Sequence, residues 1–305
     1  MARPTVYDVH VNGPLTNISV AYRNKNYIAE QVFPIVPVQK KSDLYFVFPK
    51  QAWYRNRSKP RSPGTKFPRA DYPLTTASYV CINDALSKEV TREEYENSDQ
   101  PLRPMVTAVN FVTDGLLLGL EKRVADIITA STNWASASTA GTLWSSDTSD
   151  PWGNIDTCVN AVVSQIGNAP NTAVLSWDVW RHLRQHPDFL ERVKYTRPGG
   201  RVEPEDLRSW FGFEKVLIGM SIIDSAQEGA TASMSYVWGN DFWCGYVAPS
   251  PALEEATAGY VFRWGDRTIE TFHYNEEKMD VVGGEWFTDE KITASDAGAG
   301  YYNVV

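Results

Sequence analysis

Reactive and metal-binding side chains are scarce in this sequence. Its 305 residues include 3 cysteines and 4 histidines, and Cys81, Cys158 and Cys244 stand far apart. A disulfide framework uses an even set of cysteines, and a structural zinc site needs thiolates or imidazoles at short spacing. We therefore expect three free, buried thiols and predict no metal and no cofactor.

Catalytic signatures are missing as well. The sequence has no G-x-S-x-G, P-loop or G-x-G-x-x-G motif. His182 and His186 have the spacing of a zinc-binding helix, but Leu183 stands where that motif needs a glutamate. We expect His186 to lie at a helix end instead, where a partial positive charge is favourable. The sequence predicts a protein that is not an enzyme.

Long apolar runs are also absent. No stretch approaches the roughly 18 consecutive apolar residues that a membrane helix needs. The start of the chain lacks the apolar core of a secretory signal. We expect a soluble protein that is made in a reducing cytosol.

Charge is unevenly distributed. The net charge is −8, yet residues 40–70 contain nine Lys or Arg and one Asp, a balance of +8, so the rest of the chain carries −16. A protein that clings to nucleic acid is usually basic as a whole, because its affinity comes from neutralising phosphates. The asymmetry indicates either a local nucleic-acid patch or a basic arm that reaches an acidic partner.

The N-terminal part of the chain has the pattern of an arm and a hairpin. Residues 1–39 are polar and interrupted by prolines, so we expect an extended arm with at most one short helix at residues 25–32. Residues 40–84 hold two short strands, 44–48 and 75–82, on either side of a basic, proline-rich loop. A loop of roughly 20 residues without secondary structure is uncommon inside a compact domain. The pattern therefore predicts a projecting hairpin.

The strongest helix signal follows. Apolar residues recur at three- and four-residue spacing from Leu102 to Ile128, which predicts a long helix over about residues 101–131. Pro101 and Pro104 suit its first turn. The Ser/Thr/Ala-rich residues 131–149 are expected to be a flexible loop.

The remaining sequence predicts a compact α/β region and a set of returning strands. A buried strand at residues 172–175 precedes a helix at 177–185, with Ser176 as its N-cap, and a further helix is expected from Pro204 to Phe211. Residues 294–305 are expected to form a small polar tail. Antiparallel strands that pack beside the long helix are expected at residues 260–264, 268–274 and 279–282. The expected α+β organisation comprises an arm (1–39), a hairpin (40–84), one domain from two segments (85–149 and 251–305) and a compact domain (150–250).

The basic loop is the sharpest candidate site. Its aromatic side chains could stack on bases and its charges could bind phosphates, or the same groups could anchor the loop on an acidic neighbouring protein. A plain solvated loop is the third alternative. The candidate residues are Trp53, Tyr54, Arg55, Arg57, Lys59, Arg61, Lys66 and Arg69.

An acidic segment offers a complement to this loop. Residues 84–99 contain six acids and two bases, which favours docking between subunits over the other two hypotheses. The candidate acidic residues are Glu89, Glu93, Glu94, Glu96 and Asp99.

The order of these parts resembles the major capsid proteins of tailed bacteriophages, the Hong Kong 97-type fold. The family's parts are an N-arm, an E-loop hairpin, a long spine helix, a P-domain sheet and a compact A-domain. Local sequences add to the resemblance: YRNKNYIAEQVFPIVPV at residues 22–38 is similar to the arm of one capsid group. Three segments are similar to its A-domain: WRHLRQHP at 180–187, ERVKY at 191–195 and LRSWFGFEKVLIG at 207–219.

The resemblance implies a subunit that assembles as hexamers and pentamers into an icosahedral shell around double-stranded DNA. It implies that the E-loop and N-arm lie on neighbouring subunits, that the protein resides in the virion, and that assembly occurs in the host cytoplasm. A separate scaffolding protein and a portal are the implied partners, and the sequence leaves open whether a decoration protein binds outside. Contact with the genome would be independent of its sequence, and no membrane is involved. Some members of the family crosslink their subunits through a Lys–Asn bond, but no Lys and Asn in this sequence align with that pair, so we make no prediction of a crosslink.

Other hypotheses remain open at this point. A bacterial encapsulin-type compartment would share the fold and hold a cargo enzyme in place of a genome. Another virion or tail structural protein would have a binding role without forming a shell. An enzyme with a basic substrate loop is the alternative from a different class.

Overall fold

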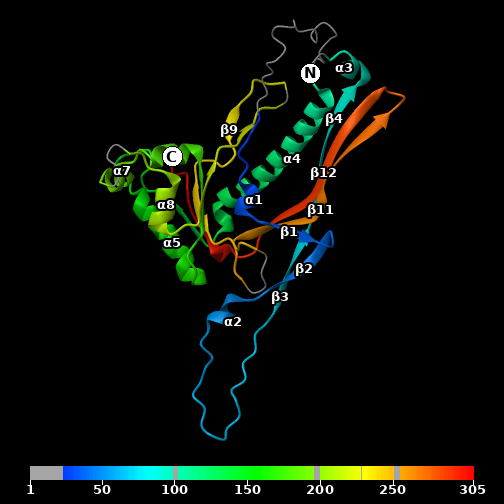
Figure 1. Ribbon diagram of the computed structural model, residues 1–305. Coiled ribbons are helices and arrows are strands. Elements are labelled where there is room, and N and C mark those ends of the chain that lie inside the picture. Colours follow the sequence, from blue (N-terminus) through cyan, green and yellow to red (C-terminus); the bar gives the residue numbers. More distant parts are fainter. Residues whose placement is uncertain (1–22, 99–101, 196–199, 228, 251–254) are drawn as a thin grey trace.

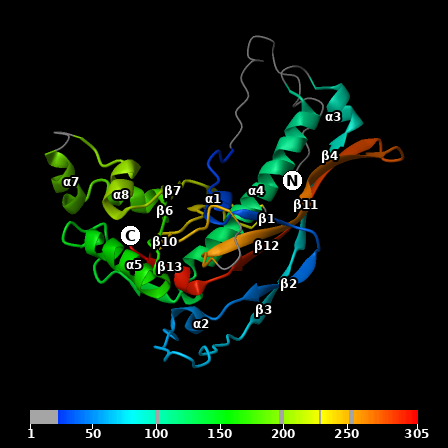
Figure 2. The same ribbon diagram turned by 60° about the horizontal axis from the view of Figure 1, so that its bottom comes forward.

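The computed structural model describes residues 23–98, 102–195, 200–227, 229–250 and 255–305. The molecule is elongated, and a compact unit lies to one side of a long helix while a narrow, twisted sheet lies to the other (Figures 1 and 2). Short helical segments accompany these parts, among them α1 (Ala29–Val32), η2 (Ser131–Asn133) and η3 (Ser295–Ala297).

The narrow sheet has four strands in the order β1-β11-β12-β4. Two long antiparallel strands form its centre, with a register shift between Trp264 and Thr268 that Gly265 accommodates at a φ of 72°. The expected short strands at 260–264 and 268–274 are therefore one continuous strand. The strand bounds are β1 (Ile35–Val38), β4 (Ile82–Thr91), β11 (Gly259–Tyr274) and β12 (Met279–Ile292).

The long helix α4 (Pro104–Thr129) packs on this sheet. Buried apolar residues repeat every four positions along it, from Ala108 through Leu116 to Ile128, as the sequence pattern predicted. Close approach depends on a glycine in each layer. A Cβ on Gly115 would lie 2.4 Å from Leu86, and a Cβ on Gly284 would lie 2.5 Å from Val112.

The compact unit contains a five-stranded mixed sheet in the order β5-β13-β10-β6-β7. Its longest helix, α5, begins at the N-cap Asp150, which accepts the Gly153 N–H, and ends at Gly167 with a φ of 72°. The helices are α5 (Pro151–Ile166), α6 (Trp177–Leu183), α7 (Pro187–Lys194) and α8 (Pro204–Phe211). The strands are β5 (Ser136–Thr139), β6 (Thr172–Ser176), β7 (Lys215–Gly219), β10 (Phe242–Gly245) and β13 (Gly298–Tyr302).

Two sequence expectations were wrong in this unit. Residues 131–149 are not simply a loop, because β5 pairs in parallel with β13. The segment expected as a polar tail supplies β13, which lies between β5 and β10. Small residues fit there because two tryptophans occupy the space: a Cβ on Gly298 would lie 2.5 Å from Trp134 and 2.8 Å from Trp243. Residues 298–302 therefore pack with the compact unit and not with the sheet that contains β11 and β12.

His186 also differs from expectation. The helix α6 ends at Leu183, and His186 is the N-cap of α7, where its Nδ1 accepts the Asp188 N–H at 3.3 Å. Its Nε2 lies 3.1 Å from Ser149 Oγ. The imidazole is buried and serves as a local structural link.

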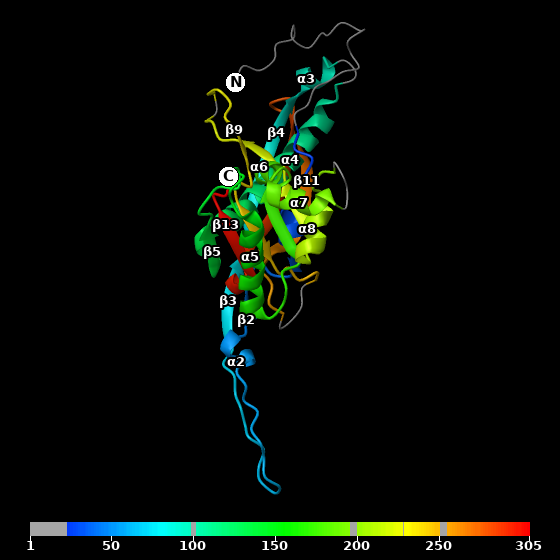
Figure 3. The same cartoon turned by 90° about the vertical axis from the view of Figure 1, so that its left-hand side faces the viewer.

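Two hairpins extend from the body. The larger one projects from the end of the sheet as a thin arm (Figure 3) and contains β2 (Ser42–Val47), α2 (Lys50–Tyr54) and β3 (Thr75–Val80). The smaller one pairs β8 (Ile222–Asp224) with β9 (Met234–Tyr236). A short helix, α3 (Arg92–Glu96), follows β4 at the opposite end of the molecule from the larger hairpin (Figure 1). In the ranges given above, no helix is both long enough and apolar enough to cross a bilayer.

Candidate intersubunit interface

The larger hairpin leaves the sheet at Cys81. Before this residue β3 pairs with β2, and after it β4 pairs with β12. Two hydrogen bonds fix the point of departure: the Cys81 N–H donates to the Lys41 carbonyl at 2.9 Å, and the Val80 N–H donates to Asp289 Oδ2 at 2.8 Å. The hairpin therefore has a defined direction relative to the sheet.

A small apolar cluster, separate from the main core, supports this junction. Its buried members are Tyr79, Cys81, Tyr260 and Phe262. Burial raises the pKa of the Cys81 thiol, and the nearby Asp289 carboxylate adds to that shift. All three cysteines are free and buried, as the sequence predicted.

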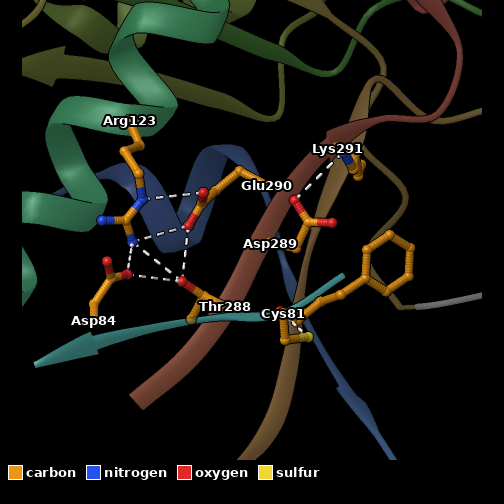
Figure 4. A network of polar contacts seen from close by, with 8 residues as sticks. Cys81, Asp84, Arg123, Thr288, Asp289, Glu290 and Lys291 are labelled. Carbon is orange, nitrogen blue, oxygen red and sulfur yellow. Dashed lines mark hydrogen bonds and ion pairs between the residues drawn. The ribbon is translucent and has the colours of Figure 1, made fainter. Parts of the chain in front are cut away.

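An ion-pair network lies beside the junction (Figure 4). Arg123 on α4 contacts Asp84 on β4 at 2.7 Å, and its Nε and Nη2 each lie 3.1 Å from an oxygen of Glu290 on β12. The same guanidinium donates to Thr288 Oγ1 at 3.1 Å. Such charge-assisted, bidentate contacts have strict geometry, so they hold the helix and two strands together where the hairpin begins.

The loop of the hairpin is ordered at its base and at its tip. At the base, Phe48, Trp53 and Tyr72 form a triangle with ring-centroid distances of 6.1, 6.1 and 6.3 Å. At the tip, the Arg61 guanidinium lies 4.4 Å from the ring centroid of Phe67 and donates to the Thr65 carbonyl at 2.6 Å. These contacts give the loop a defined conformation, although it has little regular secondary structure beyond α2.

Most of the predicted loop side chains are solvent-exposed. Trp53 and Tyr54 are 57% and 61% exposed, while Arg57 is half-buried and donates to the Asp71 carbonyl. The other predicted basic residues, Arg55, Lys59, Arg61, Lys66 and Arg69, are exposed. Among the described residues, none of the six predicted basic side chains forms an ion pair with a carboxylate.

The predicted acidic residues lie at the other end of the molecule. Glu89 is on β4, Glu93, Glu94 and Glu96 are on α3, and Asp99 lies outside the described residues. Glu96 already pairs with Arg92 at 2.7 Å. Figure 1 shows α3 and the basic loop at opposite ends, so the two candidate patches do not meet within one chain.

Sequence reasoning missed acids beside α3. The β11–β12 turn carries the exposed Glu276 and Glu277. Because Met279 pairs with Thr91, this turn lies next to the start of α3. Only the strand register could reveal this proximity, since nearly 200 residues separate the two segments. We call Glu89, Glu93, Glu94, Glu96, Glu276 and Glu277 the acidic tip.

Sequence reasoning also missed an apolar face on the hairpin. Leu44, Phe46, Val80 and Ile82 are 61%, 64%, 52% and 65% exposed. Leu44 and Phe46 share one face of β2, and the register places Val80 opposite Ser42 on that same face. Tyr45 and Tyr79 occupy the other face and pack on Phe262. The signal in the sequence was β2 itself, in which apolar side chains point to both faces of the strand. Such a strand is expected to be packed against other residues on both faces.

No protein-family model matches the chain. The major capsid protein of Burkholderia phage BcepMu is 24% identical over 299 residues, which cover 94% of each sequence. A phage-related protein from Bordetella bronchiseptica RB50 has a solved structure that is 27% identical, with a TM-score of 0.72 and coverage of 93% of both chains. The capsid of the cyanophage P-SCSP1u is 13% identical with a TM-score of 0.63, and covers 99% of this chain and 95% of its own.

The chain has the fold of phage capsid proteins, the Hong Kong 97 type, as the resemblance implied. Its relationship to curated capsid proteins extends over nearly the whole sequence. These relatives support the function of a phage major capsid protein, a structural component of the virion, and they are structural proteins and not enzymes.

Proposed function

We propose that this chain assembles as hexamers and pentamers into an icosahedral shell that encloses the double-stranded DNA of a tailed phage. The observation that carries the proposal is the projecting hairpin, which extends away from the body as a thin arm (Figure 3). At its base Tyr54 donates to the Ile166 carbonyl at 2.5 Å and Lys50 contacts Asp296 at 3.2 Å, but Leu44, Phe46, Trp53 and Phe67 are each more than half exposed. Surfaces of this kind are stabilised when a second copy covers them.

Charge supports one specific docking arrangement. The basic loop would lie on the acidic tip of a neighbouring subunit, so that Arg55, Lys59 and Arg61 meet Glu93 and Glu94. Opposite charge steers association and suppresses wrong pairings. The distance between the two patches within one chain (Figure 1) favours contacts that run from copy to copy.

Apolar contacts would add to the attraction between the basic loop and the acidic tip. Leu44, Phe46 and Trp53 offer exposed anchors on the same hairpin, and buried aromatic anchors commonly dominate the energy of an interface. The negative balance outside residues 40–70 suits a wall that encloses DNA without binding it tightly.

The domain division predicted from sequence becomes part of this proposal, with two changes. Within the described residues, 40–84 form the hairpin, and the long helix packs on the sheet of β4, β11, β12 and β1, the last of which comes from the predicted arm. The compact domain of residues 150–250 also receives β5 and β13. A separate scaffolding protein and a portal would take part, with assembly in the host cytoplasm.

Charge reversal in the loop tests the docking arrangement. The variant carries Arg55→Glu, Arg57→Glu, Lys59→Glu and Arg61→Glu, and electron microscopy of particles is the measurement. We expect no closed shells, with circular dichroism and thermal melting of the subunit unchanged. A matched control, Arg55→Lys, Arg57→Lys, Lys59→Arg and Arg61→Lys, keeps the charge and should assemble. Normal shells from the Glu variant would overturn the docking arrangement.

A further inference from the structure

The long helix carries a fully buried carboxylate. Glu121 is 0% exposed. Its Oε2 accepts the N–H groups of Ala29 at 2.8 Å and Ile28 at 3.0 Å. Its Oε1 accepts the Trp238 indole N–H at 2.7 Å and the Ser221 hydroxyl at 3.2 Å. All four donors are uncharged groups.

Such an arrangement is demanding. A buried carboxylate is strongly unfavourable unless donors replace the water that it loses. Conversely, the first N–H groups of a helix have no partners within that helix. Glu121 satisfies both needs, because Ile28 and Ala29 begin α1. Neither the carboxylate nor these donors could be left unpaired at low cost.

The donors come from two separate parts of the chain. Ile28 and Ala29 belong to the N-terminal segment, which continues into β1 of the narrow sheet. Ser221 follows β7 of the compact unit, and Trp238 follows β9. A Cβ on Gly219 would lie 2.2 Å from the Trp238 ring, so the indole is held tightly in place. Glu121 therefore lies where the N-terminal segment, the long helix and the compact unit meet.

Other contacts also join the N-terminal segment to the long helix and to the β8–β9 hairpin, but they are exposed. Arg23 Nη2 donates to Asp114 Oδ1 at 2.7 Å. Asn24 accepts the Ile222 N–H at 3.2 Å and donates to the Ile222 carbonyl at 2.9 Å. Exposed contacts of this kind contribute little to stability. The hydrogen bonds to Glu121 are the buried contacts between the N-terminal segment, the long helix and the compact unit.

We propose that Glu121 is a positioning residue that fixes the N-terminal segment and the compact unit against the long helix. The role requires a carboxylate and not merely a polar side chain. A glutamine would turn its NH₂ group toward either the indole and hydroxyl donors or the α1 N–H groups, so donors would face donors in either orientation. The consequence for assembly rests on the proposed function, because every subunit of a shell must share compatible geometry. The positioning role of Glu121 within one subunit does not depend on that function.

Hydrogen exchange of the unassembled subunit tests the proposal. In Glu121→Gln we expect the amides of residues 28–33 to exchange about tenfold faster or more, because buried donors lose their acceptor. The amides of β11 and β12 should keep their native rates. The matched control, Asp114→Asn, removes an exposed partner of the same segment and should leave residues 28–33 close to native.

Three outcomes would overturn the inference. One is native exchange at residues 28–33 in Glu121→Gln, and another is a uniform increase across α4 and both sheets. If Glu121→Gln does not fold, the measurement moves to Ser221→Ala, where we expect a smaller, local increase at residues 28–33. No change at those residues in Ser221→Ala would then be the contrary result. Failure of the wild-type chain to form shells would affect only the proposed function, because exchange is measured before assembly.

Discussion

The ring of Tyr79 stacks on the ring of Phe262 at a centroid distance of 4.7 Å and an interplanar angle of 16°. This contact joins the projecting hairpin to β11. Tyr45 approaches the same ring at 5.5 Å, so one phenylalanine supports both strands of the hairpin at its base. The direction of the hairpin thus depends on a cluster outside the main core.

We expect Phe262→Ala to lower the free energy of unfolding by about 3–5 kcal/mol, as is usual for truncating a buried aromatic residue. Urea unfolding of the unassembled subunit is the measurement. Phe272→Ala is the matched control on the same strand, because Phe272 is 48% exposed, and its effect should stay below about 1 kcal/mol. Equal losses in the two variants would argue against a structural role for the cluster.

Polar replacements on the apolar face of the hairpin should separate folding from assembly. We expect Leu44→Ser with Phe46→Ser to change the free energy of unfolding by about 0.5 kcal/mol or less, since both side chains are exposed. The same variant should form few or no shells in electron micrographs, because the neighbouring subunit loses its apolar contact. The control Leu44→Ile with Phe46→Leu preserves apolar character and should assemble. Abundant shells from the serine variant would exclude this face from the interface.

A charge exchange should rescue the reversed loop. Reversing the acidic tip alone, with Glu93, Glu94, Glu276 and Glu277 each changed to Lys, is expected to prevent assembly. Combining it with the four loop changes to Glu restores opposite charge and should restore shells. Raised salt should weaken assembly of both the native and the doubly reversed chain, because exposed charges are screened. A doubly reversed chain that stays unassembled would show that the loop docks elsewhere.

One tyrosine should make stability fall at high pH. The hydroxyl of Tyr246 donates to Glu255, and this bond together with burial raises the pKa of Tyr246 from 10.0 to about 12. The folded state therefore holds the phenol proton more tightly than the unfolded state does. Its contribution is fully present below pH 10 and is lost as the pH rises toward 12.

We expect Tyr246→Phe to show a shallower loss of stability over that pH range, measured by denaturant unfolding at several pH values. Tyr195→Phe is the control, because Tyr195 is 87% exposed, and it should follow the native curve. Identical slopes for native protein and Tyr246→Phe would contradict the assigned bond.

Periodic apolar patterns and terminal signals made much of the fold predictable. The helix expected at 101–131 occupies Pro104–Thr129, and α8 begins at Pro204 and ends before Gly212 as expected. These features depend on neighbouring residues along the chain. Similarly, the hairpin strands were found within a few positions, because prolines and charged residues bound them.

The features that were missed depend on distant partners. The residues of β13 are small, and their strand character comes from Trp134 and Trp243, which pack against them. The acidic tip includes Glu276 and Glu277 only because of the β4–β12 register. Glu121 resembles an ordinary surface acid within an amphipathic helix, and its burial depends on Ser221 and Trp238, roughly a hundred residues away.

The place of β13 makes the compact sheet depend on a segment that is remote from it in sequence. Residues 298–302 lie between β5 and β10, so these two strands are joined only through β13. A shorter product would leave the edges of β5 and β10 unpaired and would lack the strand that packs against Trp134 and Trp243. Truncated chains would then be excluded from a growing shell by their failure to fold, which amounts to a check on the integrity of each subunit.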